Sequence, residues 1–149
     1  MDSALLTSAQ ATTLSDHLRV MCPAEWVPCY STKGAGSPDA FHAACDRRGP
    51  TVIVVKASGH VFGAVVTVNW TSSSSGVHDR GAFLFRVDAA GRLDTVSIEL
   101  AAGSDDSNVF DYSSMCPMIG RYSDLNLNGC DKVEFNAFPE YPNAPGAQQ

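Results

Sequence analysis

Two runs of β-forming residues with only a tight turn between them restrict the fold of this chain most. The first run is Thr51 to Ala57, the second is Val61 to Trp70, and the turn Ser58-Gly59 followed by His60 lies between them. Runs of this kind joined by so short a connection form an antiparallel hairpin. Because the runs are almost entirely apolar, we expect both faces of the resulting sheet to be covered.

The rest of the chain predicts two helices before the hairpin and several short strands after it. A capping box of Thr7 and Gln10 opens a helix over residues 8–20, and Ser37-Pro38 opens a second over residues 38–47. This order predicts an α+β, mainly β fold: an antiparallel two-sheet β-sandwich flanked by helices. A serine-rich loop is predicted over 71–80, and further strands over 82–88, 93–100, 109–112, 122–127 and 132–138.

Composition excludes several classes of function. The 149 residues carry a formal charge of −6, and no basic run exceeds a pair of arginines, so we expect no nucleic-acid partner. The sequence has no apolar stretch of membrane-spanning length and no basic, apolar leader. We therefore expect an intracellular, cytoplasmic protein without direct membrane insertion, which could still be recruited to a membrane complex.

Five cysteines occur without a CxxC pair. An odd number of cysteines at such spacing encodes neither a zinc site nor a disulfide framework, so reduced thiols are expected. No two histidines have metal-ligand spacing with a third group. The sequence therefore predicts no metal and no cofactor.

The second predicted helix holds the strongest candidate for chemistry. His42 and Cys45 are three positions apart and share a helix face, so they could form a thiolate–imidazole pair. The favoured interpretation is structural: Phe41 and Cys45, at positions i and i+4, point into the core while His42 borders it. Asp46 is expected to make a local salt bridge or turn hydrogen bond rather than to act as a catalytic acid.

Other polar and aromatic residues have competing interpretations. Asp105, Asp106 and Asp111 could serve glycoside hydrolysis or calcium binding, but a solvated loop is favoured. Trp26 and Trp70 are expected in the core, whereas a sugar-binding sandwich would need at least one of them exposed.

Six motifs follow one another along the chain: Trp26, Tyr30-Ser31, Phe41-His42-x-x-Cys45-Asp46-x-x-Gly49-Pro50-Thr51, Gly59-His60-Val61-Phe62-Gly63, Trp70 and Phe83-Leu84-Phe85. This ordered string resembles the TLDc domain. This domain occurs in oxidation-resistance proteins and in many protist and algal proteins. Residues 3–18 are similar to the helix that precedes the domain in shorter, protist-type members.

The resemblance implies a division into an N-terminal helix (1–22), a TLDc-like sandwich (23–138) and a proline-rich tail (139–149). It also implies a non-enzymatic protein-interaction domain: a regulator or accessory subunit of a larger complex, because several members bind the vacuolar-type proton ATPase. No cofactor comes with it. Its structural residues correspond here to Trp26, Phe41, Cys45, Asp46, Phe62, Trp70, Phe83 and Phe85, with Gly49, Pro50 and Gly63 expected to set turns.

The alternatives to this function are a thiol-dependent antioxidant enzyme that uses Cys45 and His42, and a carbohydrate- or ligand-binding sandwich. For a partner surface, the loops around residues 31–36 and 71–80 are the candidates, because recognition residues collect on loops. Their named residues are Lys33, Gly34, Ser73, Ser74 and His78.

The chain departs from the TLDc pattern after Phe138, where the family's closing strand has no clear counterpart. A missing strand would leave a sheet edge unpaired, and proteins normally cover such edges. This departure suggests that a partner chain supplies the cover.

Overall fold

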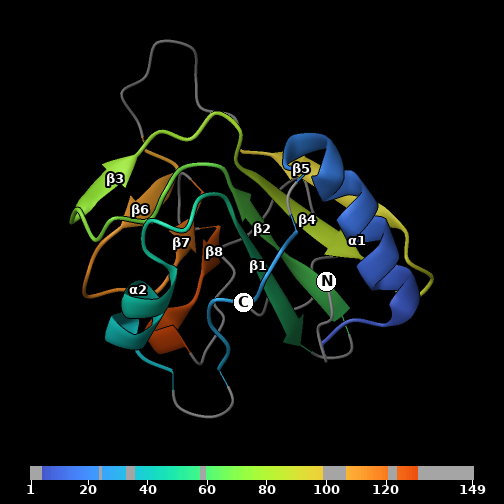
Figure 1. Ribbon diagram of the computed structural model, residues 1–149, viewed down its shortest axis with the longest axis horizontal. Coiled ribbons are helices and arrows are strands. Elements are labelled where there is room, and N and C mark those ends of the chain that lie inside the picture. The colour runs from blue at the N-terminus through green and yellow to red at the C-terminus, as the bar shows by residue number, and fades with distance from the viewer. Residues whose placement is uncertain are drawn as a thin grey trace.

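The computed structural model describes residues 5–23, 25–32, 36–57, 60–98, 107–120 and 124–130. Two four-stranded antiparallel sheets face each other, and the helices lie on the outside (Figure 1). The predicted fold class, a mainly β sandwich flanked by helices, is confirmed. The helices are α1 (Ser8–Met21), α2 (Pro38–Cys45) and the short 3-10 helix η1 (Asn128–Cys130).

The first sheet has the order β1-β2-β4-β5, and the second has the order β3-β6-β7-β8. The first sheet contains β1 (Thr51–Ala57), β2 (His60–Val66), β4 (Phe83–Val87) and β5 (Leu93–Ser97). The second contains β3 (Ser75–Val77), β6 (Val109–Asp111), β7 (Met118–Ile119) and β8 (Leu125–Asn126). The predicted hairpin is β1 and β2, which pair from Thr51↔Val66 to Ala57↔His60.

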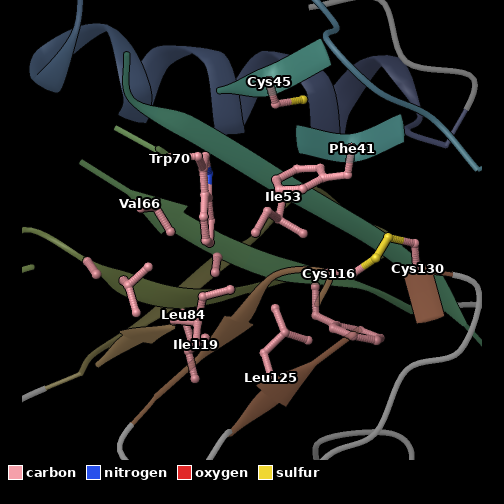
Figure 2. Packing of buried hydrophobic residues seen from close by; sticks show 14 residues of the cluster. Phe41, Cys45, Ile53, Val66, Trp70, Leu84, Cys116, Ile119, Leu125 and Cys130 are labelled. Atoms are coloured by element: carbon pink, nitrogen blue, oxygen red, sulfur yellow. A yellow bond between two sulfur atoms is a disulfide. The ribbon is translucent and has the colours of Figure 1, made fainter. Parts of the chain in front are cut away.

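Successive side chains of β2 point to opposite faces of the first sheet and divide the hydrophobic core into two clusters. Phe62, Ala64 and Val66 face the second sheet and α2, while Val65 packs with Leu14 and Leu18 of α1. Figure 2 shows the first of these clusters, in which Ile53 and Leu84 of the first sheet meet Ile119 and Leu125 of the second. Both faces of the first sheet are therefore covered, as its apolar strands predict.

Gly63 has a different role from the predicted one. It lies inside β2 rather than in a turn, directly opposite Phe85 of β4. A Cβ at Gly63 would collide with the backbone carbonyl of Ile53 and would lie 2.8 Å from the Phe85 ring. Glycine is needed here for a close approach of backbone and ring, not for a turn. Gly49, by contrast, does occupy a left-handed turn position, with φ of 92°.

Three details of the strand prediction need correction. The serine-rich loop over 71–80 contains β3, because Ser75–Val77 pair with β6. The two-residue strand β7 was not predicted, and it lies between Pro117 and Gly120. The second hairpin strand ends at Val66 rather than at Trp70. The predicted strand over 132–138, and with it the question of a missing closing strand, lies outside the described residues.

The expectation of reduced thiols is wrong for four of the cysteines. Cys29 is bonded to Cys45, and Cys116 is bonded to Cys130, with sequence separations of 16 and 14. Loops of this length give each bridge about 3 kcal/mol of stabilisation in a chain-entropy description. Cys22 remains a free thiol. The sequence did not reveal these pairs because only the packing of distant segments brings the partners together.

Among the described residues, every helix is too short or too polar to cross a bilayer.

Candidate functional site

Helix α2 places the candidate residues beside the serine-rich loop and the turn that follows β6. The Ser37 hydroxyl accepts from the Ala40 N–H and caps the helix, and Pro38 occupies its first turn. Phe41 packs edge-on against Trp70, with ring centroids 5.4 Å apart. At the other end, the Arg47 N–H donates to the Trp70 carbonyl, and Arg47 has a φ of 60°. The helix therefore ends at Cys45, two residues earlier than predicted.

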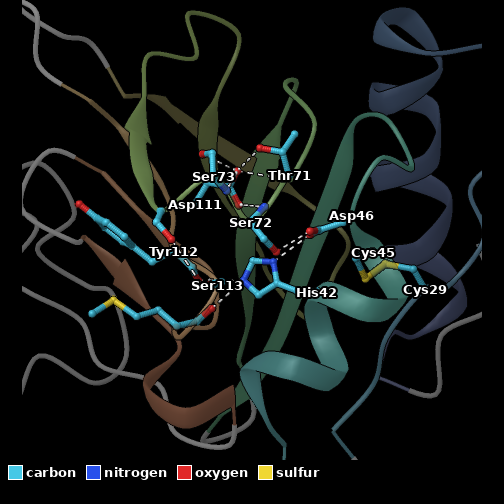
Figure 3. A network of polar contacts seen from close by, with 12 residues as sticks. Cys29, His42, Cys45, Asp46, Thr71, Ser72, Ser73, Asp111, Tyr112 and Ser113 are labelled. Atoms are coloured by element: carbon cyan, nitrogen blue, oxygen red, sulfur yellow. Dashed lines mark hydrogen bonds and ion pairs between the residues drawn. A yellow bond between two sulfur atoms is a disulfide. The ribbon is translucent and has the colours of Figure 1, made fainter.

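His42 is buried at 7% exposure, and acceptors face both of its ring nitrogens (Figure 3). Nδ1 lies 2.8 Å from Oδ1 of Asp46. Nε2 lies 2.9 Å from the Tyr112 carbonyl and 3.0 Å from the Met115 carbonyl. A neutral imidazole has only one N–H, so one nitrogen would turn a lone pair toward an acceptor. The geometry therefore favours the doubly protonated, positively charged ring.

The electrostatics of His42 agree with this geometry. Burial by itself lowers the pKa of His42, but the hydrogen bond to Asp46, the Met115 carbonyl, the Asp46 charge and the Tyr112 carbonyl outweigh it. The pKa of His42 is therefore raised above its ordinary value of 6.5. The charged ring ties α2 to the turn that follows β6.

Asp46 extends this contact to the serine-rich loop. Its Oδ2 accepts from the Ser72 hydroxyl at 2.6 Å, while Oδ1 binds His42. Asp46 therefore forms the local salt bridge that was expected of it, and it also makes a long-range bond. Ser72 has a φ of 54°, a left-handed conformation that is uncommon for a residue with a side chain.

Asp111 is the centre of the second half of the network. Its side-chain oxygens accept five hydrogen bonds from three consecutive residues of the serine-rich loop: backbone bonds from Thr71, Ser72 and Ser73, and hydroxyl bonds from Thr71 and Ser73. Consecutive N–H groups that converge on one anion form a nest. The expectation that Asp111 lies in a solvated loop is wrong, because Asp111 is 1% exposed. Asp105 and Asp106 lie outside the described residues.

The donors around Asp111 control its ionisation. Burial raises the pKa of Asp111, but the hydrogen bonds from Thr71 and Ser73 outweigh it and hold the pKa below the ordinary value of 3.8. The Asp111 carboxylate is therefore charged at neutral pH and fills the loop nest with an internal anion.

His42, Asp46 and Asp111 are also the group of described residues that could approach a metal ion, since their ligand atoms lie within 4.8 Å of one another. Their hydrogen bonds do not fit that role. A doubly protonated His42 has no lone pair to offer, and the Asp111 oxygens already face five donors. The cluster is built as a closed network of hydrogen bonds.

The ionisation of His42 predicts a pH dependence of stability. A pKa raised by folding stabilises the native state fully below pH 6.5, and this contribution is lost as pH rises through the folded-state value. Urea unfolding of the unmodified chain should therefore show stability that falls as pH rises above 6.5 and through the raised pKa of His42. His42→Gln should be less stable throughout and should lack this slope. His78→Gln, at an exposed histidine, should keep it; an equal slope in both variants would contradict the assignment.

The pair proposed for thiol chemistry does not assemble as a nucleophile and base. Cys45 is fully buried and bonded to Cys29, and the His42 nitrogens face Asp46 and two carbonyls (Figure 3). Trp70 is 1% exposed, so it offers no stacking surface to a sugar. Trp26 is partly buried against the α1 cluster, the group of apolar side chains around Leu14 and Leu18. The structure also buries Phe41, Phe62, Phe83 and Phe85.

The candidate partner residues of the serine-rich loop lie at the surface. Ser73, Ser74 and His78 are exposed, although the Ser73 side chain also binds Asp111. Pro50, at the turn before β1, is exposed as well. Lys33 and Gly34 lie outside the described residues.

Sequence reasoning missed a second surface beside this loop. In β6, Val109 and Asp111 are buried, so Phe110 and the following Tyr112 lie on the outward face. Their rings are stacked with centroids 6.3 Å apart, and Met118 is the cross-strand neighbour of Phe110. We call Phe110, Tyr112 and Met118 the β6 face. The two-residue spacing of the aromatic residues Phe110 and Tyr112 in the sequence could have revealed this face.

The comparisons agree with the fold. The family model described as the TLDc domain matches residues 1–138 of the 149-residue chain. Comparison with curated proteins and with solved structures gives no significant match. The family match spans α1, α2, the strands β1 to β8 and the His42–Asp46–Ser72–Asp111 network. This chain belongs to the TLDc domain family.

Proposed function

We propose that this chain is a non-enzymatic protein-interaction domain, a regulator or accessory subunit of a larger complex. The observation that carries the proposal is the closed network around α2. Its histidine, carboxylates and serines bind one another, and the neighbouring Cys45 is fully buried. A catalytic site needs a base or nucleophile aimed at a substrate, and these groups are aimed at their own chain.

The network has a clear use in an interaction domain. It fixes the serine-rich loop and the turn after β6 on a rigid sandwich, and recognition residues are commonly carried by loops held in this way. Ser74 and His78 of that loop, and the neighbouring β6 face, present polar and aromatic groups together. Tyrosine, phenylalanine and methionine are enriched at protein interfaces.

The TLDc family indicates where to look for the partner. The vacuolar-type proton ATPase and oxidative-stress protection are the assembly and the process that the resemblance suggests first. We also propose that the domain acts on the cytoplasmic side of such a complex.

The test is affinity capture from the cells that produce the chain, followed by cross-linking and mass spectrometry. We expect a complex much larger than the 15.8 kDa chain, with cross-links that involve the serine-rich loop or the turn after β6. Phe110→Ser combined with Tyr112→Ser should reduce recovery of the partner about tenfold or more, as for the loss of interface anchors.

The matched control is Val20→Ser combined with Val27→Ser, which removes the two most exposed large apolar side chains of the described residues. Val20 belongs to α1, far from β6 in Figure 1. This control should retain the partner. A chain that elutes alone at its own mass would overturn the proposal, and equal loss in both pairs of substitutions would exclude the β6 face as the binding surface.

A further inference from the structure

The two disulfides differ in their access to solvent and in what they hold. Cys116 and Cys130 are both buried, at 3% and 7% exposure, and Cys45 is fully buried. Cys29 is only half-buried. A thiolate must reach a sulfur atom to exchange with a disulfide, so Cys29, the most exposed of the four bonded cysteines, is the expected point of attack.

The half-buried bridge holds an irregular segment over residues 25–32. Within the described part of the chain, no backbone–backbone hydrogen bond involves this segment. Three of its side chains attach it: Trp26 packs against the α1 cluster, Cys29 is bonded to Cys45, and Tyr30 contacts Phe41 and accepts from the Ser37 N–H. The disulfide is therefore the single covalent tie between this segment and the end of α2.

Helix α2 does not depend on that bridge in the same way. Its Phe41 packs on Trp70, its His42 binds two carbonyls of the turn after β6, and its Asp46 binds Ser72. None of these contacts involves sulfur. Opening the bridge would leave residues 25–32 held by the Trp26 and Tyr30 contacts alone. Helix α2 would stay seated on the sandwich, which the buried Cys116–Cys130 bridge continues to tie.

We propose that the Cys29–Cys45 disulfide is a redox-sensitive strap, which a dithiol opens while the sandwich stays folded, loosening the attachment of residues 25–32 to α2. One thiolate of the dithiol bonds to Cys29 Sγ, the S–S bond breaks, and Cys45 Sγ leaves with the electron pair and takes up a proton. The second thiol then attacks the mixed disulfide and releases Cys29 as a thiol. The bridge gains two electrons, and the dithiol becomes a cyclic disulfide.

The strap would give the domain two states that follow the redox poise of its compartment. Disulfides persist in oxidising compartments and are reduced in the cytosol. The Cys29–Cys45 bond is thus closed in an oxidising compartment and open in the cytosol, and residues 25–32 are the segment whose attachment differs between the two. This inference does not depend on the proposed partner.

The test uses the oxidised chain with Cys22→Ser, which removes the free thiol that could exchange with the bridges. The protein is incubated with dithiothreitol under native conditions, quenched in acid and alkylated after denaturation, and each cysteine is quantified by peptide mass spectrometry. We expect Cys29 and Cys45 to become alkylated about tenfold faster than Cys116 and Cys130, or more. Opening of both bridges at one rate would overturn the proposal.

Limited proteolysis provides the second measurement. After selective reduction, chymotrypsin should cut after Trp26 and Tyr30 faster than in the oxidised chain, while β2 and β4 stay intact. Cys29→Ser should reproduce this pattern without reductant, and Cys116→Ser should not accelerate cleavage within 25–32. An unchanged cleavage rate within 25–32 in the reduced chain, or a Cys29→Ser variant that fails to fold, would contradict the strap.

Discussion

Replacing Asp111 by asparagine is expected to lower the free energy of unfolding by about 4 kcal/mol. The carboxylate is 1% exposed and accepts five hydrogen bonds from Thr71, Ser72 and Ser73. An amide removes the charge and turns an NH₂ group toward N–H and O–H donors, so several buried donors lose their acceptor. Urea unfolding at neutral pH, followed by tryptophan fluorescence, measures the loss.

Asp16→Asn is the matched control, because Asp16 is an exposed carboxylate on α1. Its unfolding midpoint should stay close to that of the unmodified chain. The contribution of Asp111 to the free energy of unfolding should also depend on pH in acid. A pKa lowered by folding stabilises the native state above the ordinary pKa of 3.8, and this stabilisation is lost as pH falls through the pKa of the folded state. A stable Asp111→Asn variant with unchanged acid unfolding would show that the nest does not support the fold.

Replacing Gly63 by alanine is expected to cost about 3 kcal/mol or more, through overpacking inside a sheet. The added methyl group would collide with the Ile53 carbonyl and would lie 2.8 Å from the Phe85 ring. The ring could rotate, but the carbonyl belongs to β1, which pairs with β2 along its whole length. Separating these strands would disturb the centre of the sandwich.

Gly49→Ala separates this steric effect from the general cost of losing a glycine. Gly49 has a φ of 92°, and a Cβ there meets nothing within 4 Å. We expect a cost of about 1 kcal/mol from backbone strain alone. Thermal unfolding of the two variants should therefore rank Gly63→Ala well below Gly49→Ala. The reverse order would contradict the close approach of β1 and β2.

The sequence predicted the parts of the fold that depend on local chemistry. The Thr7 capping box and the Ser37 cap mark where the helices begin, and the apolar run over Thr51–Ala57 matches β1 residue for residue. Period-two alternation along β2 follows from its two covered faces. These signals are carried by neighbouring residues, so they need no knowledge of the tertiary structure.

The features that the sequence did not predict depend on distant segments. Cys45 finds Cys29 only because residues 25–32 cross the end of α2, and Asp111 is buried only because the serine-rich loop folds over it. β3 is a strand because β6 lies beside it, although serine and glycine have low strand propensity. The candidate site could be predicted as a set of residues, but its closed hydrogen bonding could not.

The ionisation of His42 tests the central claim, that the polar centre of the domain is a closed structural network rather than a catalytic site. Nitrogen NMR of the ring, with resonances assigned through His42→Gln, reports whether each nitrogen carries a proton. We expect Nδ1 and Nε2 both to be protonated at neutral pH, because both face acceptors. A neutral ring with an unprotonated, solvent-accessible nitrogen would contradict it and would provide the base that an enzyme needs.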